Sequence, residues 1–393
     1  MTTHAPSSSR LPLVTFVLFA AGVALIQFHI RAEIILGLAG IGWGILAWRD
    51  GVRPSVPAFF TPLLGLALVT AISAAASSDP LYSMARLKQF LLFLVVPLAM
   101  RVATGKRASQ VIDVIIALGS AAAIVGVIQY IASTSPEDLM SHRPHGFLSH
   151  YMTYSGVLML VICAAVARLL FREREWVWPA VAIPALFVAL AATNSRNVWV
   201  GTAAALGTIM AARRRILLLV LPLVIVVAGA IAPGVIRDRA WSIFDPNYAS
   251  NRDRVAMLKA GIAMVKDHPV LGVGMNMVPK VYLQYRTPDA FDSADAKGPE
   301  TRSHLHNVPM QIAAERGLIA LAMWLWFVVV AGRDLWKRLR HGTAPAVAAA
   351  GLAALIAMLV AGLFEHNFGD SEFLILLLTL MTLPFAAEES ERA

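Results

Sequence analysis

Residues 344–363 read APAVAAAGLAALIAMLVAGL, a stretch without a single charged side chain. A helix needs about 20 mostly apolar residues to cross the hydrocarbon core of a bilayer. Comparable apolar runs recur along the chain, at 11–28, 33–48, 57–76, 84–101, 108–132, 150–170, 176–193, 197–212, 215–233, 308–331 and 372–387. The sequence therefore predicts an all-α protein, a polytopic integral membrane bundle of about twelve transmembrane helices.

The composition agrees with a lipid environment. Of the 393 residues 58% are hydrophobic and 15% are charged, whereas a soluble domain has roughly 25% charged residues. The formal net charge of +9 is better explained by cytoplasmic loops that face anionic membrane lipids than by nucleic-acid binding. The single cysteine, Cys163, lies inside an apolar run, so disulfides and thiolate metal sites are excluded.

Basic residues indicate the orientation, because Lys and Arg accumulate in cytoplasmic loops. When the N-terminus with Arg10 is placed in the cytoplasm, every inner loop is basic. These loops hold Arg49 and Arg53; Arg101, Lys106 and Arg107; Arg168, Arg172 and Arg174; Arg213, Arg214 and Arg215; and Arg333, Lys337, Arg338 and Arg340. The short outer loops hold only isolated arginines, namely Arg31, Arg143 and Arg196. This asymmetry favours an even number of spans.

One long outer segment divides the chain. Nine predicted spans occupy residues 1–233 and three occupy 308–393, so the loop at 234–307 is the largest non-membrane part of a single membrane domain. Within it, residues 251–267 have helical periodicity, with one apolar stripe formed by Val255, Leu258, Ile262 and Val265. HPVLGVG at 268–274 then ends this helix with a proline and a glycine-rich turn. We predict an amphipathic helix in a periplasmic loop.

Ionisable side chains at the outer membrane surface are the functional candidates, because such groups are costly near lipid. They are Arg86, Lys88, Arg143, Arg196, Arg254, His304, His306, Glu315, Glu365, His366 and Asp370. Arginine matches phosphate oxygens with two parallel hydrogen bonds and keeps its charge, and a histidine of near-neutral pKa can accept a proton. The set favours the handling of a lipid-linked phosphate or pyrophosphate.

Several candidates have a structural alternative. His306 and Asn307 precede an apolar run, and asparagine is a good helix N-cap. Arg196 could be a snorkelling residue at the interface. Arg86 and Lys88 lie two residues apart, so they are expected on different faces of a helix.

Other candidates have alternatives of the same kind. Arg143 in HRPHG is as compatible with a solvated loop as with a phosphate ligand, and Arg254 with the polar face of an interfacial helix. Glu365, His366 and Asp370 flank a short turn, where helix capping is the expected role. HLH at 304–306 supplies two zinc ligands, too few without a third nearby.

Three segments carry a family resemblance. They are TNSRNVWVG at 193–201, RVAMLKAGIAMVKDHPVLGVG at 254–274 and HNVPMQIAAERGLIA at 306–320. They resemble, in this order, the Ser-Arg signature, the amphipathic helix with its glycine-rich turn, and the His-Asn…Glu-x-Gly signature of the bacterial O-antigen ligase and polymerase superfamily. The chain looks most like the lipopolysaccharide O-antigen ligases within this superfamily.

The resemblance implies a GT-C-like bundle in the bacterial inner membrane with its active site facing the periplasm. The implied reaction transfers a polysaccharide from undecaprenyl pyrophosphate to a sugar hydroxyl of lipid A–core, with inversion and without a metal or other cofactor. His306 would be the catalytic base. The implied pyrophosphate ligands are Arg196, Arg143, Arg86 and Arg254, and the supporting residues are Asn307, Glu315 and Asp370.

Three alternatives stay open. An O-antigen polymerase of the same superfamily would use the same donor and another lipid-linked glycan as acceptor. A protein O-oligosaccharyltransferase would use a Ser or Thr hydroxyl. A lipid-linked glycan transporter belongs to a different class; transporters usually have related halves and broken helices near the midplane, and the sequence displays neither.

Overall fold

The computed structural model describes residues 10–28, 32–51, 55–132, 143–171, 177–287 and 304–389, and all its regular elements in these ranges are helices. The first half contains α1 (Leu11–Leu25), α2 (Ala32–Asp50), α3 (Phe60–Ala75), α4 (Pro80–Met84), the 3-10 helix η2 (Ala85–Leu94), α5 (Val95–Val102), α6 (Lys106–Ala132), α8 (Tyr151–Phe171) and α9 (Val177–Ala192). The second half contains α10 (Arg196–Arg213), η3 (Arg215–Leu219), α11 (Val220–Ile231), α12 (Gly234–Trp241), α13 (Ala249–Asp267), α14 (Val278–Tyr285), α15 (Val308–His341), α16 (Pro345–Ala361) and α17 (Ser371–Glu389).

Each predicted apolar run is helical in the structure. Among the described residues, seven helical stretches have the length and apolar composition needed to cross a membrane: Leu11–Phe28, Ala32–Arg49, Pro80–Val102, Lys106–Ala132, Tyr151–Phe171, Val308–His341 and Ser371–Glu389. Shorter apolar helices lie at Phe60–Ala75, Val177–Ala192, Arg215–Ile231 and Pro345–Ala361. The prediction of a helical, multi-pass membrane protein is confirmed, while the number of twelve spans stays a prediction.

The centre of the bundle is formed by α8, α16 and α17, whose side chains are buried along most of their length. Small residues allow this close packing, as is usual between membrane helices. A Cβ atom at Gly201 of α10 would lie 2.9 Å from the carbonyl oxygen of Ala357 in α16, so only glycine fits there. Cys163 is fully buried in α8, as predicted.

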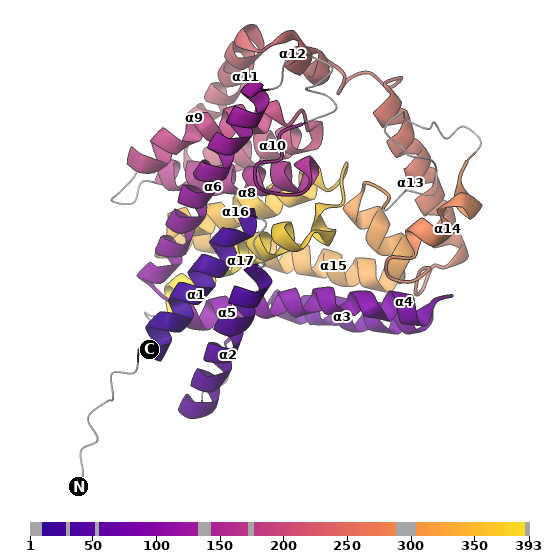
Figure 1. Ribbon diagram of the computed structural model, residues 1–393, viewed down its shortest axis with the longest axis horizontal. Helices are drawn as coiled ribbons and strands as arrows, with labels where there is room; N and C mark the ends of the chain where they lie inside the picture. Colours follow the sequence, from indigo (N-terminus) through magenta and orange to yellow (C-terminus); the bar gives the residue numbers. More distant parts are fainter. Residues whose placement is uncertain are drawn as a thin grey trace.

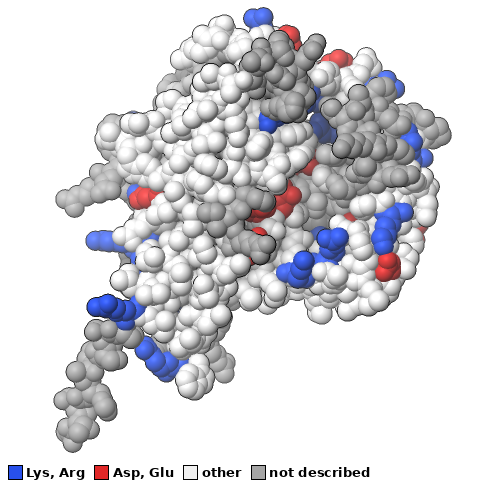
Figure 2. All heavy atoms as spheres, viewed as in Figure 1, with Lys and Arg blue, Asp and Glu red and all other residues white. Residues whose placement is uncertain are grey.

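The helices α15 and α2 contribute to the candidate site described below. The long helix α15 lies beside α3, and α2 projects away from the bundle (Figure 1). Few residues of α2 are buried. The face in Figure 2 is largely uncharged, as a lipid-facing surface should be, with scattered Lys and Arg.

The described part of the predicted outer segment, residues 234–287 and 304–307, contains α12, α13 and α14, which reach out beside the bundle (Figure 1). The predicted amphipathic helix is confirmed as α13. Its buried face consists of small residues and methionines, Ala256, Met257, Ala260, Gly261 and Met264, packed near Leu305 and α14. Of the predicted stripe, Val255, Leu258 and Ile262 face outward, whereas Val265 is partly buried against this cluster. Small side chains let α13 approach α15 closely, and the three outward-facing residues are left on the outside.

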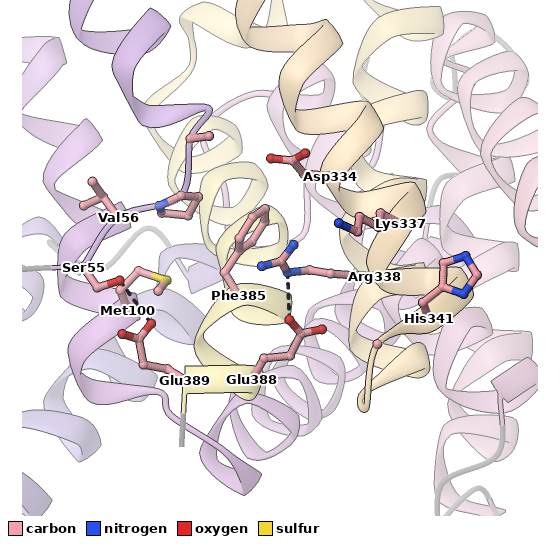
Figure 3. A pocket seen from close by; sticks show the side chains of 13 residues that line it. Ser55, Val56, Met100, Asp334, Lys337, Arg338, His341, Phe385, Glu388 and Glu389 are labelled. Atoms are coloured by element: carbon pink, nitrogen blue, oxygen red, sulfur yellow. Dashed lines mark hydrogen bonds and ion pairs between the residues drawn. The ribbon is translucent and has the colours of Figure 1, made fainter. Parts of the chain in front are cut away.

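A polar region lies where α15 and α17 end (Figure 3). A cavity of about 420 Å³ is lined there by Ser55, Arg338 and Glu388, among others. Arg338 lies 3.3 Å from Glu388 and stacks over Phe385 at 3.8 Å. Arg338 belongs to the basic group Arg333, Lys337, Arg338 and Arg340, which the sequence places on the cytoplasmic side.

Candidate active site

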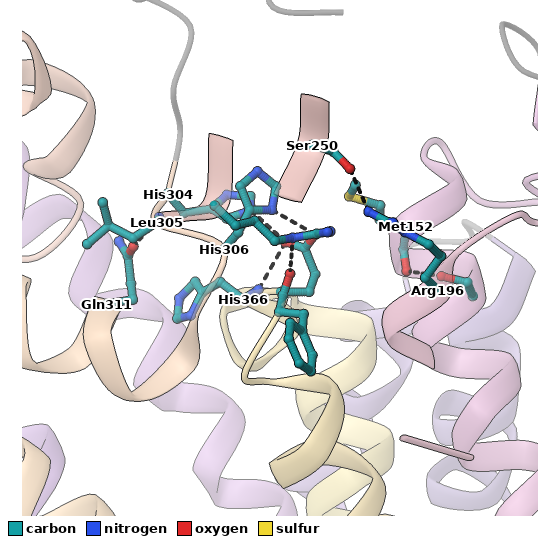
Figure 4. Close-up of polar contacts among 12 residues, drawn as sticks. Met152, Arg196, Ser250, His304, Leu305, His306, Gln311 and His366 are labelled. Carbon is teal, nitrogen blue, oxygen red and sulfur yellow. Dashed lines mark hydrogen bonds and ion pairs between the residues drawn. The ribbon is translucent and has the colours of Figure 1, made fainter. Parts of the chain in front are cut away.

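Glu365, in the turn between α16 and α17, is the centre of a polar cluster with the loop before α15. Its side chain is buried, and each of its oxygens contacts one histidine. His304 Nε2 lies 2.7 Å from Oε1, and His306 Nδ1 lies 2.8 Å from Oε2. The backbone N–H of His366 also donates to Oε1 at 2.9 Å. The structure therefore joins the predicted base to a carboxylate 59 residues further along the chain (Figure 4).

The charge state of Glu365 fixes the proton positions on both rings. Burial alone would raise the pKa of Glu365, but the charges and hydrogen bonds of His306 and His304 outweigh it and hold the pKa well below the ordinary value. An ionised carboxylate only accepts hydrogen bonds, so the two ring nitrogens that face it must carry protons. A neutral His306 then has its proton on Nδ1 and a lone pair on Nε2, the arrangement a general base requires.

His304 differs from His306 in position. Burial disfavours its protonated form, yet the hydrogen bond and charge of Glu365 outweigh burial and raise the pKa of His304. His304 lines the cavity described below, whereas His306 is not among the residues of that lining. The two ring centroids lie 4.4 Å apart.

Asn307 explains how the loop holds His306. Asn307 Oδ1 accepts a hydrogen bond from the backbone N–H of Met310 at 2.8 Å and so caps α15. Its Nδ2 donates to the carbonyl of Leu363 at 2.9 Å, which ties the start of α15 to the end of α16. His306 adopts a left-handed backbone conformation, with φ of 50°. Capping is thus performed by Asn307, and the imidazole of His306 remains available for another role.

The glycine-rich turn after α13 docks against α15. Val273 and Gly274 donate backbone hydrogen bonds to the carbonyls of Ala314 and Glu315, and Leu318 donates to Pro269. Gly317 kinks α15 with φ of 80°, and a Cβ atom there would lie 1.9 Å from the carbonyl oxygen of Val270. Glycine is therefore required at the end of the Glu-Arg-Gly sequence, since any side chain would prevent the docking.

Three of the four predicted pyrophosphate ligands lie in one group of arginines, Arg143, Arg196, Arg239 and Arg254. Arg196 and Arg239 both lie over the ring of Tyr248, at 5.0 and 5.4 Å from its centroid. Arg254 donates through Nε to the carbonyl of Phe364 at 3.1 Å, directly before Glu365. Arg143 stacks on Tyr151 at 4.6 Å. This arginine group therefore adjoins the histidine–carboxylate cluster.

Arg196 is buried and holds the outer segment in place. Its NH1 group donates to the carbonyl and hydroxyl of Ser242, at 2.6 and 3.0 Å. Its NH2 group donates to Ser250 at 2.6 Å and to Asn251 at 2.7 Å (Figure 4). Arg196 thus connects α10 to the end of α12 and the first turn of α13, and these contacts use the two terminal nitrogens that a phosphate would need.

A cavity of about 1120 Å³ lies on the other side of the cluster. Its polar end is lined by His304, His366, Asp370, Glu315 and Arg316, and its apolar part by α2, η2 and α5. Several apolar lining residues are also exposed, including Ile41 at 62% and Leu91 at 66%. The cavity therefore continues to the outer surface of the bundle between α2 and η2.

Arg86 and Lys88 both line this cavity, although the sequence places them on different faces of an α-helix. The physical reason is that η2 is a 3-10 helix. Residues two apart are separated by about 120° around such a helix, compared with about 160° in an α-helix. Apart from the Tyr82 ring 5.2 Å from Arg86, neither cation has a polar partner within the described residues.

The predicted supporting residues also reach this region. Asp370 accepts a hydrogen bond from Thr153 at 3.2 Å, and burial, followed by the charge of Glu365, raises its pKa to about 7. Glu315 is buried in α15 and lines the cavity. Burial, together with the positive charges of His304 and Arg316, holds the pKa of His366 well below the ordinary value. The site therefore combines a proton acceptor, anion-binding side chains and two carboxyl groups of different ionisation.

Some members of the site have little local signal in the sequence. Glu365 lies in a turn where capping is the expected role, and only the fold brings it to His306. No motif pattern singles out Arg239 or Arg316. One signal exists for Arg239, because an arginine in an outer loop is unusual under the positive-inside rule.

The ligand atoms of His304, His306 and Glu365 lie within 4.8 Å of one another, close enough to hold a metal ion.

Residues 180–325 match the family model described as O-antigen ligase. The resemblance to the O-antigen ligase and polymerase superfamily is confirmed. The matched region contains all three motif segments, including Arg196, Arg254 and His306. Members of this superfamily are glycosyltransferase-like enzymes. The comparison with curated proteins found no match.

Proposed function

We propose that this protein is an O-antigen ligase that transfers a glycan from undecaprenyl pyrophosphate to a sugar hydroxyl of lipid A–core at the periplasmic face of the bacterial inner membrane. The observation that carries the proposal is the pairing of His306 with Glu365 beside the arginine group. It offers an oriented base next to a concentration of positive charge, which is what displacement of a diphosphate by a hydroxyl requires.

In the proposed reaction, Nε2 of His306 takes the proton of the acceptor hydroxyl as its oxygen attacks the anomeric carbon. The new glycosidic bond forms while the bond from that carbon to the diphosphate oxygen breaks. Attack opposite to the leaving group inverts the anomeric centre. The diphosphate departs with the electron pair, and its charge is stabilised by Arg143 and Arg254, with Arg196 and Arg239 behind them. No step in this scheme requires a metal.

The cavity suits the acceptor of a ligase. A ligase must admit lipid A–core, a phosphorylated glycolipid anchored in the same leaflet as the donor, and therefore needs a lateral opening near the outer surface. The cavity between α2 and η2 provides apolar walls and two cations, Arg86 and Lys88, at the level of the site. In this proposal the acceptor occupies the cavity and its core sugars reach His306, while the donor diphosphate occupies the arginine group.

A deletion strain tests the assignment. Loss of a ligase leaves lipid A–core without O-chains on a lipopolysaccharide gel, and long chains accumulate on polyprenyl pyrophosphate in lipid extracts. A core that carries one O-unit, without long lipid-linked chains, would identify the protein as a polymerase instead. Complementation with His306→Ala should fail, whereas His268→Ala, an exposed histidine at the end of α13, should restore the wild-type pattern.

A further inference from the structure

The histidine–carboxylate cluster has the composition of a metal site. His304 Nε2, His306 Nδ1 and one oxygen of Glu365 lie within 4.8 Å of one another. Two imidazoles and a carboxylate are a frequent protein ligand set for zinc, with the fourth position left to water or substrate. The three ligands come from two separate segments, the loop before α15 and the turn before α17, which Asn307 ties together through its hydrogen bond to Leu363.

The dimensions of the cluster suit a zinc ion. Zn–N and Zn–O distances of about 2.0–2.2 Å in a tetrahedral site place neighbouring ligand atoms roughly 3.3 Å apart. The present separations between Glu365 oxygens and the histidine nitrogens are 2.7 and 2.8 Å. Each of these two contacts is thus roughly 0.5–0.6 Å shorter than the separation of neighbouring ligand atoms in a tetrahedral zinc site.

A second feature favours a cation at this place. Glu365 is 3% exposed, and its side chain contacts the two imidazoles and the backbone N–H of His366. The ring of His366 lies beside the cluster, with its centroid 5.9 Å from that of His304. Buried carboxylates favour a compensating charge, and imidazole nitrogen selects zinc over magnesium.

We propose that His304, His306 and Glu365 form an inhibitory zinc site. Binding of zinc to Nδ1 of His306 leaves the ring proton on Nε2, because a neutral imidazole carries one proton on the nitrogen that is not coordinated. The nitrogen that faces the acceptor hydroxyl then has no lone pair. The inhibitory consequence rests on the proposed role of His306, whereas the binding of zinc does not.

The binding is measured by calorimetry on the full chain in lipid nanodiscs, purified with an affinity tag that contains no histidine. Wild type should bind one zinc ion per chain, and magnesium should give no signal at the same concentration. Glu365→Gln and His304→Ala should each weaken binding by roughly 100-fold or more, beyond the 10–100-fold that residues behind the ligands contribute. His304→Gln provides a second variant of similar size if alanine destabilises the loop, and His268→Ala is the matched control.

Two results would overturn the site. The first is the absence of saturable zinc binding by wild type, and the second is zinc binding that Glu365→Gln, His304→Ala and His304→Gln all leave unchanged. If zinc binds with the expected dependence on these residues and also blocks glycan transfer, both the site and the base assignment are supported. If zinc binds in this way and transfer continues at the wild-type rate, the zinc site stands and His306 is not the base.

Discussion

Glu365→Gln should remove most of the catalytic activity while it preserves the shape of the site. The backbone N–H of His366 donates to Oε1 of Glu365 at 2.9 Å. In the glutamine variant this N–H requires an acceptor, so the amide oxygen takes the Oε1 position and the NH2 group takes the Oε2 position. That NH2 group faces Nδ1 of His306, which must then accept a hydrogen bond. The ring proton moves to Nε2, and the base is lost.

The magnitude follows from the role of a general base, which contributes roughly 10²–10⁴ in rate. This range corresponds to about 3–5 kcal/mol in the activation free energy, at about 1.4 kcal/mol for each tenfold change. KM for both substrates should change little, since Glu365 contacts the histidines rather than the substrates. Folding stability should stay within about 1 kcal/mol, because each hydrogen bond of the carboxylate finds a counterpart in the amide.

The assay uses the purified variant in nanodiscs with lipid-linked donor and lipid A–core, and the product is quantified by gel over time. Glu388→Gln is the matched control. It also removes one carboxylate that faces a cation, Arg338 at 3.3 Å, but at the opposite end of the bundle. A kcat of Glu365→Gln within threefold of wild type would refute the tautomer argument and the pairing of Glu365 with a catalytic His306.

Four further predictions follow from the site and the topology. Arg196→Lys should lose most activity, because one ammonium group cannot replace the four hydrogen bonds to Ser242, Ser250 and Asn251; full activity in complementation would show that only the positive charge matters. The pKa of Asp370, raised to about 7 by burial, means that the folded state keeps this proton between about pH 4 and 7 while the unfolded chain releases it. Wild-type stability should fall across that window as pH rises, and Asp370→Asn should reduce the fall by about 1–2 kcal/mol in thermal unfolding curves, after allowance for partial exposure; parallel curves for both proteins would contradict this. Transfer by the purified protein should survive EDTA, and a loss that magnesium or manganese restores would contradict arginine stabilisation of the leaving group. After replacement of Cys163, a cysteine at position 293, which lies outside the described residues, should react with an impermeant thiol reagent from the periplasm, and one in place of Gly342 should not; the opposite pattern would reverse the orientation.

Local patterns in the sequence were enough to predict the helices and much of the outer loop. Hydropathy depends only on neighbouring residues and on lipid as the solvent, and the predicted runs are helical in the structure. The helix at 251–267 and the turn that ends it follow from apolar periodicity and from the proline and glycines. The cap at Asn307 is local as well, because its partner Met310 lies three residues away.

The face that α13 buries required the tertiary structure. Periodicity predicted one stripe of Val255, Leu258, Ile262 and Val265, and the first three lie exposed while Val265 is partly buried. The neighbouring elements decide which side is covered. The close approach of α13 to α15 and Leu305 needs small side chains, and a Cβ atom at Gly261 would lie 2.6 Å from Met310. The three exposed residues of the stripe therefore lie outward.

Some residues of the candidate site were predictable from the sequence, and others were identified only by the tertiary structure. Residue chemistry and the predicted side of the membrane were sufficient to predict the arginines and His306 as candidates, because ionisable side chains near lipid are costly and are usually functional. The partner of His306 was not predictable, because Glu365 lies 59 positions away and a contact over that distance leaves no periodic pattern. The position of Arg86 and Lys88 on one cavity also depends on tertiary structure, because the cavity is lined by segments far apart in the chain, including α2, η2 and the start of α15. Chain neighbours thus determined the elements and their membrane placement, and packing between distant segments determined which carboxylate meets the base.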